Sequence, residues 1–275
     1  MQAVDSFSPH TDLSCQALAA AGIVGALRDQ YNTSRAEVDR LHRHGLAFAL
    51  IFERAGNAAL VTPELGERHA RDAVAFARSI GLPPGATIFY AEADTHIRRE
   101  SFSGATRYWS LAAGPTRDAG YRVGAYGGSK LIDHLREVGV ADQTWQTAAE
   151  SWNEWTESQT RVLRQLIGYR YFGGVQTDVN DVHAADWGQW NADGTTGPIP
   201  GTNQEDNDMA ESIKRLLEDS EGRTWLCWDG FKRYLPKQSQ VDTCLAVNVI
   251  DARWDAEGNR RPGQDELLDV LSPQP

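Results

Sequence analysis

From residue 2 to about residue 183, short apolar runs alternate with stretches that carry the apolar spacing of amphipathic helices. The apolar runs have the length of strands, and helical stretches such as 34–45 and 129–139 begin with a serine cap and close on glycine. Repeated alternation of this kind predicts parallel strands covered by helices. The predicted strands cover residues 2–7, 22–31, 45–53, 86–94, 121–128, 142–152, 161–169 and 173–181, and further helical signals lie in 63–81.

The last two predicted strands, 161–169 and 173–181, are separated by only a few residues. A parallel crossover needs roughly a dozen residues or more, so these two strands should form an antiparallel hairpin, and we take the seventh as the reversed strand. The fold class predicted is therefore α/β: a TIM-like (β/α) barrel of eight strands with about five full helical crossovers. The barrel begins as a TIM barrel and closes with a more antiparallel section.

After residue 185 the pattern changes. Residues 186–208 are rich in Gly, Pro, Thr and Asn and read as a linker. Residues 212–236 have the pattern of a β-meander with turns at 220–222 and 229–230, and 244–254 would add another strand. The predicted organisation is a barrel domain at 1–185, the linker at 186–208, and a small β-rich accessory domain at 209–275.

Each predicted barrel strand ends in a polar residue. The carboxyl ends of the strands are where active sites lie in (β/α) barrels, so this series outlines a cleft. For the seventh strand, taken as reversed, the alternative to Gln165 is a residue near the start of the strand. The strand-end residues are Asp5, Arg28, Glu53, Asp94, Tyr126, Gln146, Gln165 and Asp178.

Composition narrows the ligands that such a cleft would take. The net charge is −11 and the basic residues form no long run, which argues against nucleic acid as a partner. No stretch approaches the ~20 apolar residues of a membrane helix, so membrane insertion is not expected. The nine tryptophans and many carboxylates suit sugars, since aromatic faces stack on pyranose rings and carboxylates accept hydroxyl hydrogen bonds. Trp145 and Trp187 are stacking candidates, with core packing as the alternative.

The strand-end residues resemble those of the glycoside-hydrolase-like domain of unknown function 1906, which is related to the family 25 lysozymes (N-acetylmuramidases). The resemblance covers residues 2–183, and its most specific short matches are "GAYG" on the fifth strand and "DVN" on the eighth. It implies hydrolysis of a glycan such as peptidoglycan, with acidic residues at the ends of strands one and four. Family 25 enzymes carry Asp-x-Glu on strand four, whereas this chain has the reverse order, Glu92-Ala93-Asp94.

Glycoside hydrolysis needs one carboxyl group that donates a proton and another that stays charged. On the resemblance we expect Asp94 to be the acid and Asp5 the charged partner. Glu92 is the third catalytic candidate, but it lies one step deeper on the strand and is better suited to a buried supporting role, paired with Arg28. The substrate-binding candidates are Arg28, Glu53, Tyr126, Trp145, Gln165 and Asp178.

Two places in the sequence carry residue types that bind metal ions. Asp94 with His96, and Asp178 with Asn180 and His183, are suitable ligand types, but the latter lacks the glycine and terminal glutamate of an EF-hand loop. Neither has the spacing of a zinc site. We expect no metal and no cofactor.

The leading hypothesis for function is a glycoside hydrolase of bacterial cell-wall glycan, such as a phage lysin or a wall-degrading virion protein. The alternative is a catalytically inactive glycan-binding or phage tail protein, whose C-terminal unit would mediate oligomerisation or contact virion proteins. The residues "MQAVDSFSPH" lack the pattern of a Sec signal peptide. We therefore expect a protein made in the cytoplasm that reaches the wall after release or in a virion.

Overall fold

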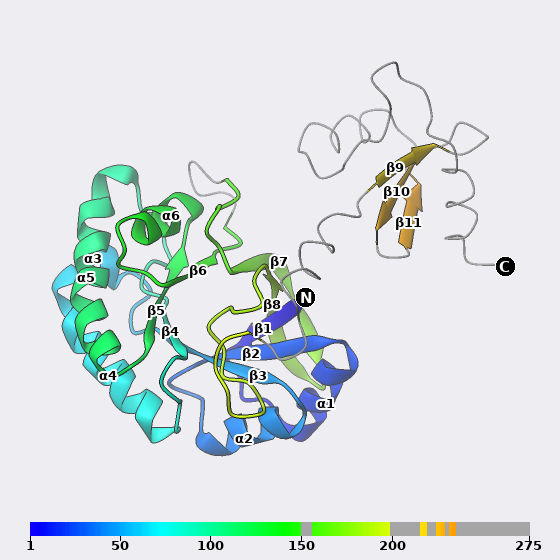
Figure 1. Cartoon of the computed structure of the whole chain (residues 1–275), viewed down its shortest axis with the longest axis horizontal. Helices are drawn as coiled ribbons and strands as arrows, with labels where there is room; N and C mark the ends of the chain where they lie inside the picture. The colour runs from blue at the N-terminus through cyan, green and yellow to red at the C-terminus, as the bar shows by residue number, and fades with distance from the viewer. Residues whose placement is uncertain (150–155, 199–214, 219–223, 229–230, 235–275) are drawn as a thin grey trace. The chain divides into compact units, whose positions relative to one another are not determined.

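The computed structural model describes residues 1–149, 156–198, 215–218, 224–228 and 231–234. The chain divides into two units, Met1–Gly201 and Thr202–Pro275. The first is a closed barrel of eight strands in the order β1 to β8, with its helices on the outside (Figure 1). The strands are β1 Gln2–Ser6, β2 Ile23–Asp29, β3 Ala47–Phe52, β4 Thr87–Tyr90, β5 Arg122–Gly127, β6 Gln143–Gln146, β7 Leu163–Phe172 and β8 Val175–Val182.

Helical segments fill the five connections from β1 to β6. They are α1 Asp12–Ala20, α2 Arg35–Arg43, α3 Ala58–Val61, η1 Pro63–Leu65, α4 Gly66–Ser79, η2 Arg99–Ser101, α5 Phe102–Asp118 and α6 Ser129–Glu137. Side-chain caps fix the start of the first two helices, where Thr11 accepts from the amide of Ser14 and Ser34 from that of Glu37. The predicted eight strands and five helical crossovers are confirmed. No helix in the described part of the chain has the length and apolar character that spanning a membrane requires.

The direction of the last strands differs from the prediction in one respect. β7 and β8 form the expected antiparallel hairpin, but β7 runs parallel to β6, and β8 is antiparallel to both β7 and β1. The reversed strand is thus the eighth, not the seventh. Leu163 at the start of β7 pairs with Trp145 of β6 in parallel, and a short hairpin pattern alone does not reveal this pairing.

Strand alternation divides the barrel residues between two environments. Side chains on the inner face form one apolar cluster, and those facing the helices form another. Leu27 lies in the inner cluster and its neighbour Ala26 in the outer one, and Phe89 and Tyr90 are divided in the same way. Each strand therefore presents alternate residues to the barrel interior and to the helix layer. This parity decides which strand-end residues reach the cleft.

Residues 186–198 pack on the amino-terminal end of the barrel. The amide of Phe48 donates to the carbonyl of Trp190, and that of Thr87 to the carbonyl of Gly188, each at 2.9 Å. Trp187 is fully buried in the inner cluster. This part of the predicted linker therefore covers the amino-terminal end of the barrel. Its composition, rich in Gly and Thr, predicts an exposed segment, but its two tryptophans, Trp187 and Trp190, are buried. The rest of the predicted linker lies outside the described residues, and the predicted domain boundaries stay predictions.

In the second unit the described residues form three strands, β9 Arg215–Glu218, β10 Thr224–Trp228 and β11 Phe231–Tyr234. They pair antiparallel in the order β11-β10-β9, which is the order of the predicted meander. The further strand predicted at 244–254 lies outside the described residues.

Candidate active site

A cleft of about 370 Å³ opens at the carboxyl-terminal end of the barrel strands. Asp5, Asp29 and Glu53 come from the ends of the first three strands, and Asp178 comes from the reversed strand β8. Four carboxyl groups thus face one small volume, at the place where barrels of this kind carry their active sites. The lining residues are Asp5, Ser6, Phe7, Ser8, Asp29, Ile51, Glu53, Gln176, Thr177 and Asp178.

Asp5 is held by a chain of hydrogen bonds that starts in the barrel core. The indole Nε1 of Trp145 donates to Asn180 Oδ1 at 2.7 Å, which turns the amide nitrogen of Asn180 toward Asp5. That nitrogen donates to Asp5 Oδ2, also at 2.7 Å. Trp145 and Asn180 are buried, so the orientation of the Asp5 carboxyl group is fixed from below.

Gln165 connects the acidic groups to the opposite wall. Its Nε2 lies 3.4 Å from both Asp5 Oδ2 and Asp178 Oδ2, and its Oε1 lies 2.9 Å from the Tyr126 hydroxyl. The same hydroxyl is 2.9 Å from Thr147 Oγ1 and 3.4 Å from Asp94 Oδ1. Since a hydroxyl has one proton, Tyr126 donates to one of these acceptors at a time. Five of the predicted site residues, Asp5, Asp94, Tyr126, Gln165 and Asp178, are therefore brought together.

Burial of these acids disfavours their charged forms. It raises the pKa of Asp5 to about 7; the hydrogen bond from Asn180 acts in the opposite direction, and the charge of Asp178 adds to the rise. Burial, helped by the charges of Asp94, Glu92 and Asp29, also raises the pKa of Glu53 to about 7. Partial burial raises the pKa of Asp94 and of Asp178. Asp5, expected as the permanently charged partner, is thus partly protonated near neutral pH.

Glu92 has a structural position. It is fully buried and its carboxylate accepts the backbone amides of Arg54, Ala55 and Ala58, at 2.6 to 3.4 Å. Burial raises its pKa against the effect of these hydrogen bonds. The expected pairing with Arg28 is wrong: the titratable partner nearest to Glu92 is His69, at 3.6 Å. Glu92 holds the loop that leads from β3 into α3.

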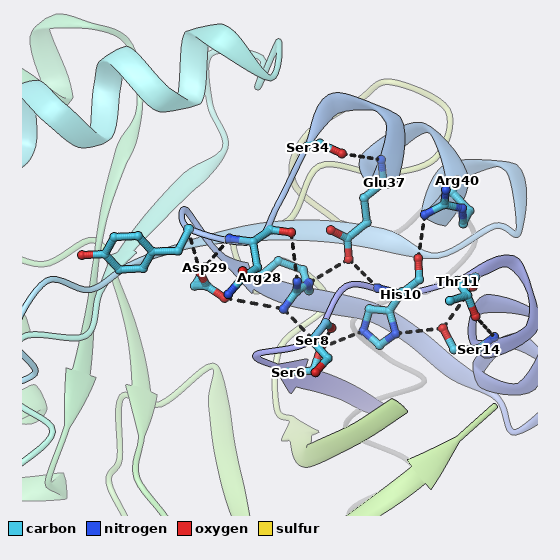
Figure 2. A network of polar contacts seen from close by, with 12 residues as sticks. Ser6, Ser8, His10, Thr11, Ser14, Arg28, Asp29, Ser34, Glu37 and Arg40 are labelled. Atoms are coloured by element: carbon cyan, nitrogen blue, oxygen red, sulfur yellow. Dashed lines mark hydrogen bonds and ion pairs between the residues drawn. The ribbon is translucent and has the colours of Figure 1, made fainter. Parts of the chain in front are cut away.

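Arg28 also lies away from the cleft. It is fully buried on the helix side of β2, where its Nε donates to Glu37 Oε1 at 2.8 Å and its Nη1 reaches Ser6 Oγ at 3.3 Å (Figure 2). The prediction of a substrate-binding Arg28 is contradicted by this burial. The strand end was placed one residue early, and the next residue, Asp29, is the one that lines the cleft. His10, which contacts Ser6 Oγ at 3.0 Å, belongs to the same network.

The predicted stacking tryptophans belong to the core. Trp145 is 3% exposed, and its ring centroid lies 4.5 Å from that of Tyr126. Its indole nitrogen donates to Asn180. Trp187 is fully buried. Neither can present a ring face to a sugar. Gln146 is also fully buried and donates to the carbonyl of Thr156. Asn180 was considered in the sequence only as a metal ligand, and its "DVN" context was the one signal for its role beside Asp5.

Within the described residues, no group of three or more His, Cys, Asp or Glu side chains is placed to hold a metal ion. His183 is partly buried, and burial lowers its pKa to about 4. The carboxyl groups of the cleft are arranged around amide and hydroxyl donors, which is the environment of acid–base chemistry.

The barrel unit is similar to known proteins. The family model of the Rv2525c-like, glycoside hydrolase-like domain matches residues 22–198. Rv2525c of Mycobacterium tuberculosis, described as a candidate peptidoglycan hydrolase, is 28% identical over 192 residues, which are 62% of this chain and 77% of that protein.

Two solved structures share the fold. The crystal structure of Rv2525c with L-tartrate has a TM-score of 0.59 at 24% identity, covering 69% of this chain and 98% of that chain. A protein of B. stearothermophilus has a TM-score of 0.51 at 18% identity, covering 66% and 95%. Neither bears on a phage origin or on virion partners, which stay predictions.

The predicted localisation is wrong. We expected a protein without a signal peptide that reaches the wall after release or in a virion, whereas Rv2525c is a Tat-secreted protein. The prediction considered only the Sec type of leader, and the relative uses another route of export. The family resemblance, in contrast, is confirmed. With a family model that matches well over half of its residues, and with the barrel observed, the chain belongs to the Rv2525c-like family of glycoside hydrolase-like domains.

Proposed function

We propose that this protein hydrolyses the glycan strands of bacterial peptidoglycan in the acidic cleft, outside the cytoplasmic membrane. The observation that carries the proposal is the gathering of four carboxyl groups at the barrel mouth, two of which, Asp5 and Glu53, have a pKa of about 7. An acid of that pKa holds a proton at neutral pH and can give it to a glycosidic oxygen. The family match and the description of Rv2525c favour a wall glycan as the substrate.

In this proposal Asp5 is the proton donor. Asn180 and Gln165 both contact Oδ2, so Oδ1 is the oxygen left to carry the proton toward the cleft. Asp94 is the charged partner, because the hydroxyl of Tyr126 can donate a hydrogen bond to its carboxylate. Tyr126 also contacts Gln165, which in turn contacts Asp5, so the two acids are linked through these side chains. The roles expected from the resemblance are thereby exchanged. Glu53, Asp29 and Asp178 accept hydrogen bonds from sugar hydroxyls.

A second candidate function is glycan binding without hydrolysis. It is favoured by the fourth strand, where Glu92, the only glutamate of the reversed pair, is turned to the helix side and used to hold a loop. In that case the cleft would recognise the glycan through the same carboxylates and would cleave nothing.

Purified cell walls distinguish the two candidates. The wild type, Asp5→Asn and Asp94→Asn would be compared for loss of turbidity and for sedimentation with the walls, followed by mass analysis of the released muropeptides. Clearing by the wild type alone, with binding kept by both variants and a new reducing end on a sugar, supports hydrolysis. Binding by all three proteins without clearing overturns it and leaves the binding function.

A further inference from the structure

The exposed aromatic side chains of the barrel unit gather at one end. Within the described residues, four aromatic side chains are exposed: Phe7 (74%), Tyr31 (55%), Tyr169 (59%) and Tyr171 (62%). Phe7 and Tyr31 follow the carboxyl ends of β1 and β2, and the tyrosines lie on the part of β7 that extends past β6. Single exposed apolar residues are ordinary on a protein surface, but a set confined to the mouth of a cleft marks a binding surface.

The pairing of the strands places the two β7 tyrosines on the face of the acidic residues. Tyr169 stands opposite Asp178 on β8, and Asp178 stands opposite Asp5 on β1. Tyr171 stands opposite Gln176, which lines the cleft. Directly opposed residues of antiparallel strands project from the same face. Asp5, Asp178 and Tyr169 therefore form one row across three strands, and the tyrosines continue the inner face of the barrel beyond its rim.

The tyrosine pair is held in place. The Tyr171 hydroxyl donates to Gln176 Oε1 at 3.2 Å, and the two rings meet edge to face with their centroids 5.7 Å apart. At the hairpin turn, Gly173 has φ +55°, and a Cβ there would lie 2.6 Å from the backbone of Ser14. The hairpin therefore rests closely on the start of α1. Rings fixed in this way lose little conformational freedom when a ligand packs against them.

The cleft itself is small for a polymer. Its volume of about 370 Å³ lies at the lower end of the roughly 300–1,000 Å³ of small-molecule sites, so a glycan strand that enters it must continue over the rim. On the side of the β7–β8 hairpin, the glycan would contact Tyr169 and Tyr171. Aromatic rings with one polar tip suit a pyranose, which presents an apolar ring face and hydroxyl edges.

We propose that Tyr169 and Tyr171 form a sugar-stacking subsite that binds a pyranose ring of the glycan strand beyond the acidic cleft. This proposal rests on the function proposed above and adds the direction in which the strand leaves the cleft. The subsite makes recognition depend on the length of the glycan: a short oligosaccharide fills the cleft alone, and a longer one also reaches the tyrosines.

Calorimetric titration with N-acetylglucosamine oligomers of two and five sugars tests this length dependence. The full chain carrying Asp5→Asn serves as the reference, so that hydrolysis does not interfere. Adding Tyr169→Ala and Tyr171→Ala should weaken binding of the pentamer at least tenfold and change binding of the dimer less than twofold. Tyr169→Phe with Tyr171→Phe should keep pentamer binding within about threefold, because the ring faces remain. Val138→Ala, at an exposed apolar position after α6, is the matched control and should change neither affinity.

Equal weakening of dimer and pentamer by the alanine pair, or no weakening of either, overturns the subsite. A second result would also overturn the subsite. If the variant with Tyr169→Ala and Tyr171→Ala loses self-association, measured by light scattering, but binds the pentamer as before, the tyrosines contact a second copy of the chain and not a sugar. Failure of the proposed function is distinguishable: the wild type would leave walls uncleared while the alanine pair still lost pentamer binding selectively. That result keeps the subsite and removes the hydrolysis.

Discussion

Arg28 and Asp29 are neighbours on β2, yet they belong to two clusters of opposite character. On the helix side, Arg28 is paired with Glu37, whose Oε1 also accepts the backbone amide of His10. On the inner side, Asp29 joins Asp5, Glu53 and Asp178 at the cleft. Of the four acids that line the cleft, Asp29 forms an ion pair with Arg28, at 3.6 Å. Within the described residues, the other three, Asp5, Glu53 and Asp178, form no ion pair with an arginine or lysine.

The two clusters differ in what burial does to their protons. On the helix side, burial and the nearby charge of Arg28 lower the pKa of His10 to about 4, so the imidazole stays neutral. In the cleft, burial raises the pKa of Asp5 and of Glu53 to about 7. The first cluster is built to hold elements together in one charge state. The second keeps exchangeable protons where a substrate would lie, which is the arrangement expected of an acid–base site.

Removing one partner of the helix-side ion pair should have the largest effect. Arg28→Leu leaves Glu37 buried without its cation, and we expect a loss of about 3–5 kcal/mol in the free energy of unfolding, measured by urea denaturation. The double variant Arg28→Leu/Glu37→Leu is the control, since it removes both charges and should recover most of the loss. If the single and the double variant are equally destabilised, the pair is not the support that its geometry indicates.

Asp5 should make the protein less stable as the pH rises. Its folded pKa of about 7 exceeds the ordinary aspartate value of 3.8, so between these values the folded state binds more protons than the unfolded state. The free energy of unfolding therefore falls with pH across this range. Asp5→Asn should match the wild type near pH 3.5 and exceed it by about 4 kcal/mol at pH 8. Asp12→Asn, at an exposed carboxyl group whose pKa is lowered by the hydrogen bond to His44, should show no gain at pH 8. A gain of equal size at both pH values would contradict the assignment.

His10 should act in the opposite direction. Its pKa of about 4 lies below the ordinary histidine value of 6.5, so across this range the unfolded state binds more protons, and stability is lost on acidification. His10→Gln should flatten the dependence between pH 7 and pH 4 by about 3 kcal/mol, measured by the same denaturation series. His183, whose pKa is also lowered to about 4, should leave a residual slope. An unchanged slope in the variant would show that His10 is protonated without cost.

The sequence predicted the barrel because its physical signals are local. The eight apolar runs, the Ser34 cap and the short β7–β8 connection all act over a few residues. The predicted cap at Ser129 is wrong, because α6 already includes Ser129 and its N-cap is Gly128, which makes no side-chain cap. Which strand of the hairpin is reversed was not local information: it depends on whether β7 pairs with β6 in parallel, which the hairpin pattern does not specify. The burial of Trp187 in the same inner cluster as Ala47 of β3 and Phe89 of β4 also depends on strands that are distant in the sequence.

The site was predicted where strand parity could be followed and missed where it could not. Asp5 and Glu53 have inward parity and reach the cleft, whereas Arg28 was one residue too early. β4 ends at Tyr90, before Glu92 and Asp94, so strand alternation does not decide where these two side chains point. Glu92 turns to the helix layer and Asp94 to Tyr126. Asn180 gains its role only through Trp145 and Asp5, which lie 35 and 175 positions away in the chain.

Trp145→Phe tests whether that long-range chain of hydrogen bonds tunes Asp5. The change removes the donor to Asn180 Oδ1, and the freed amide can turn its nitrogen away from Asp5. That hydrogen bond lowers the pKa of Asp5, so its loss should raise the pKa, and the alkaline limb of wall-clearing activity should move to higher pH. The expected cost in stability is about 1–2 kcal/mol, for one buried hydrogen bond and a smaller ring. Trp109→Phe is the matched control, because Trp109 is equally buried and donates from Nε1 to the carbonyl of Gly124, but contacts the helix side. It should show a similar loss of stability with the limb unmoved, and equal shifts in both variants would mean that the limb reports on packing rather than on Asn180.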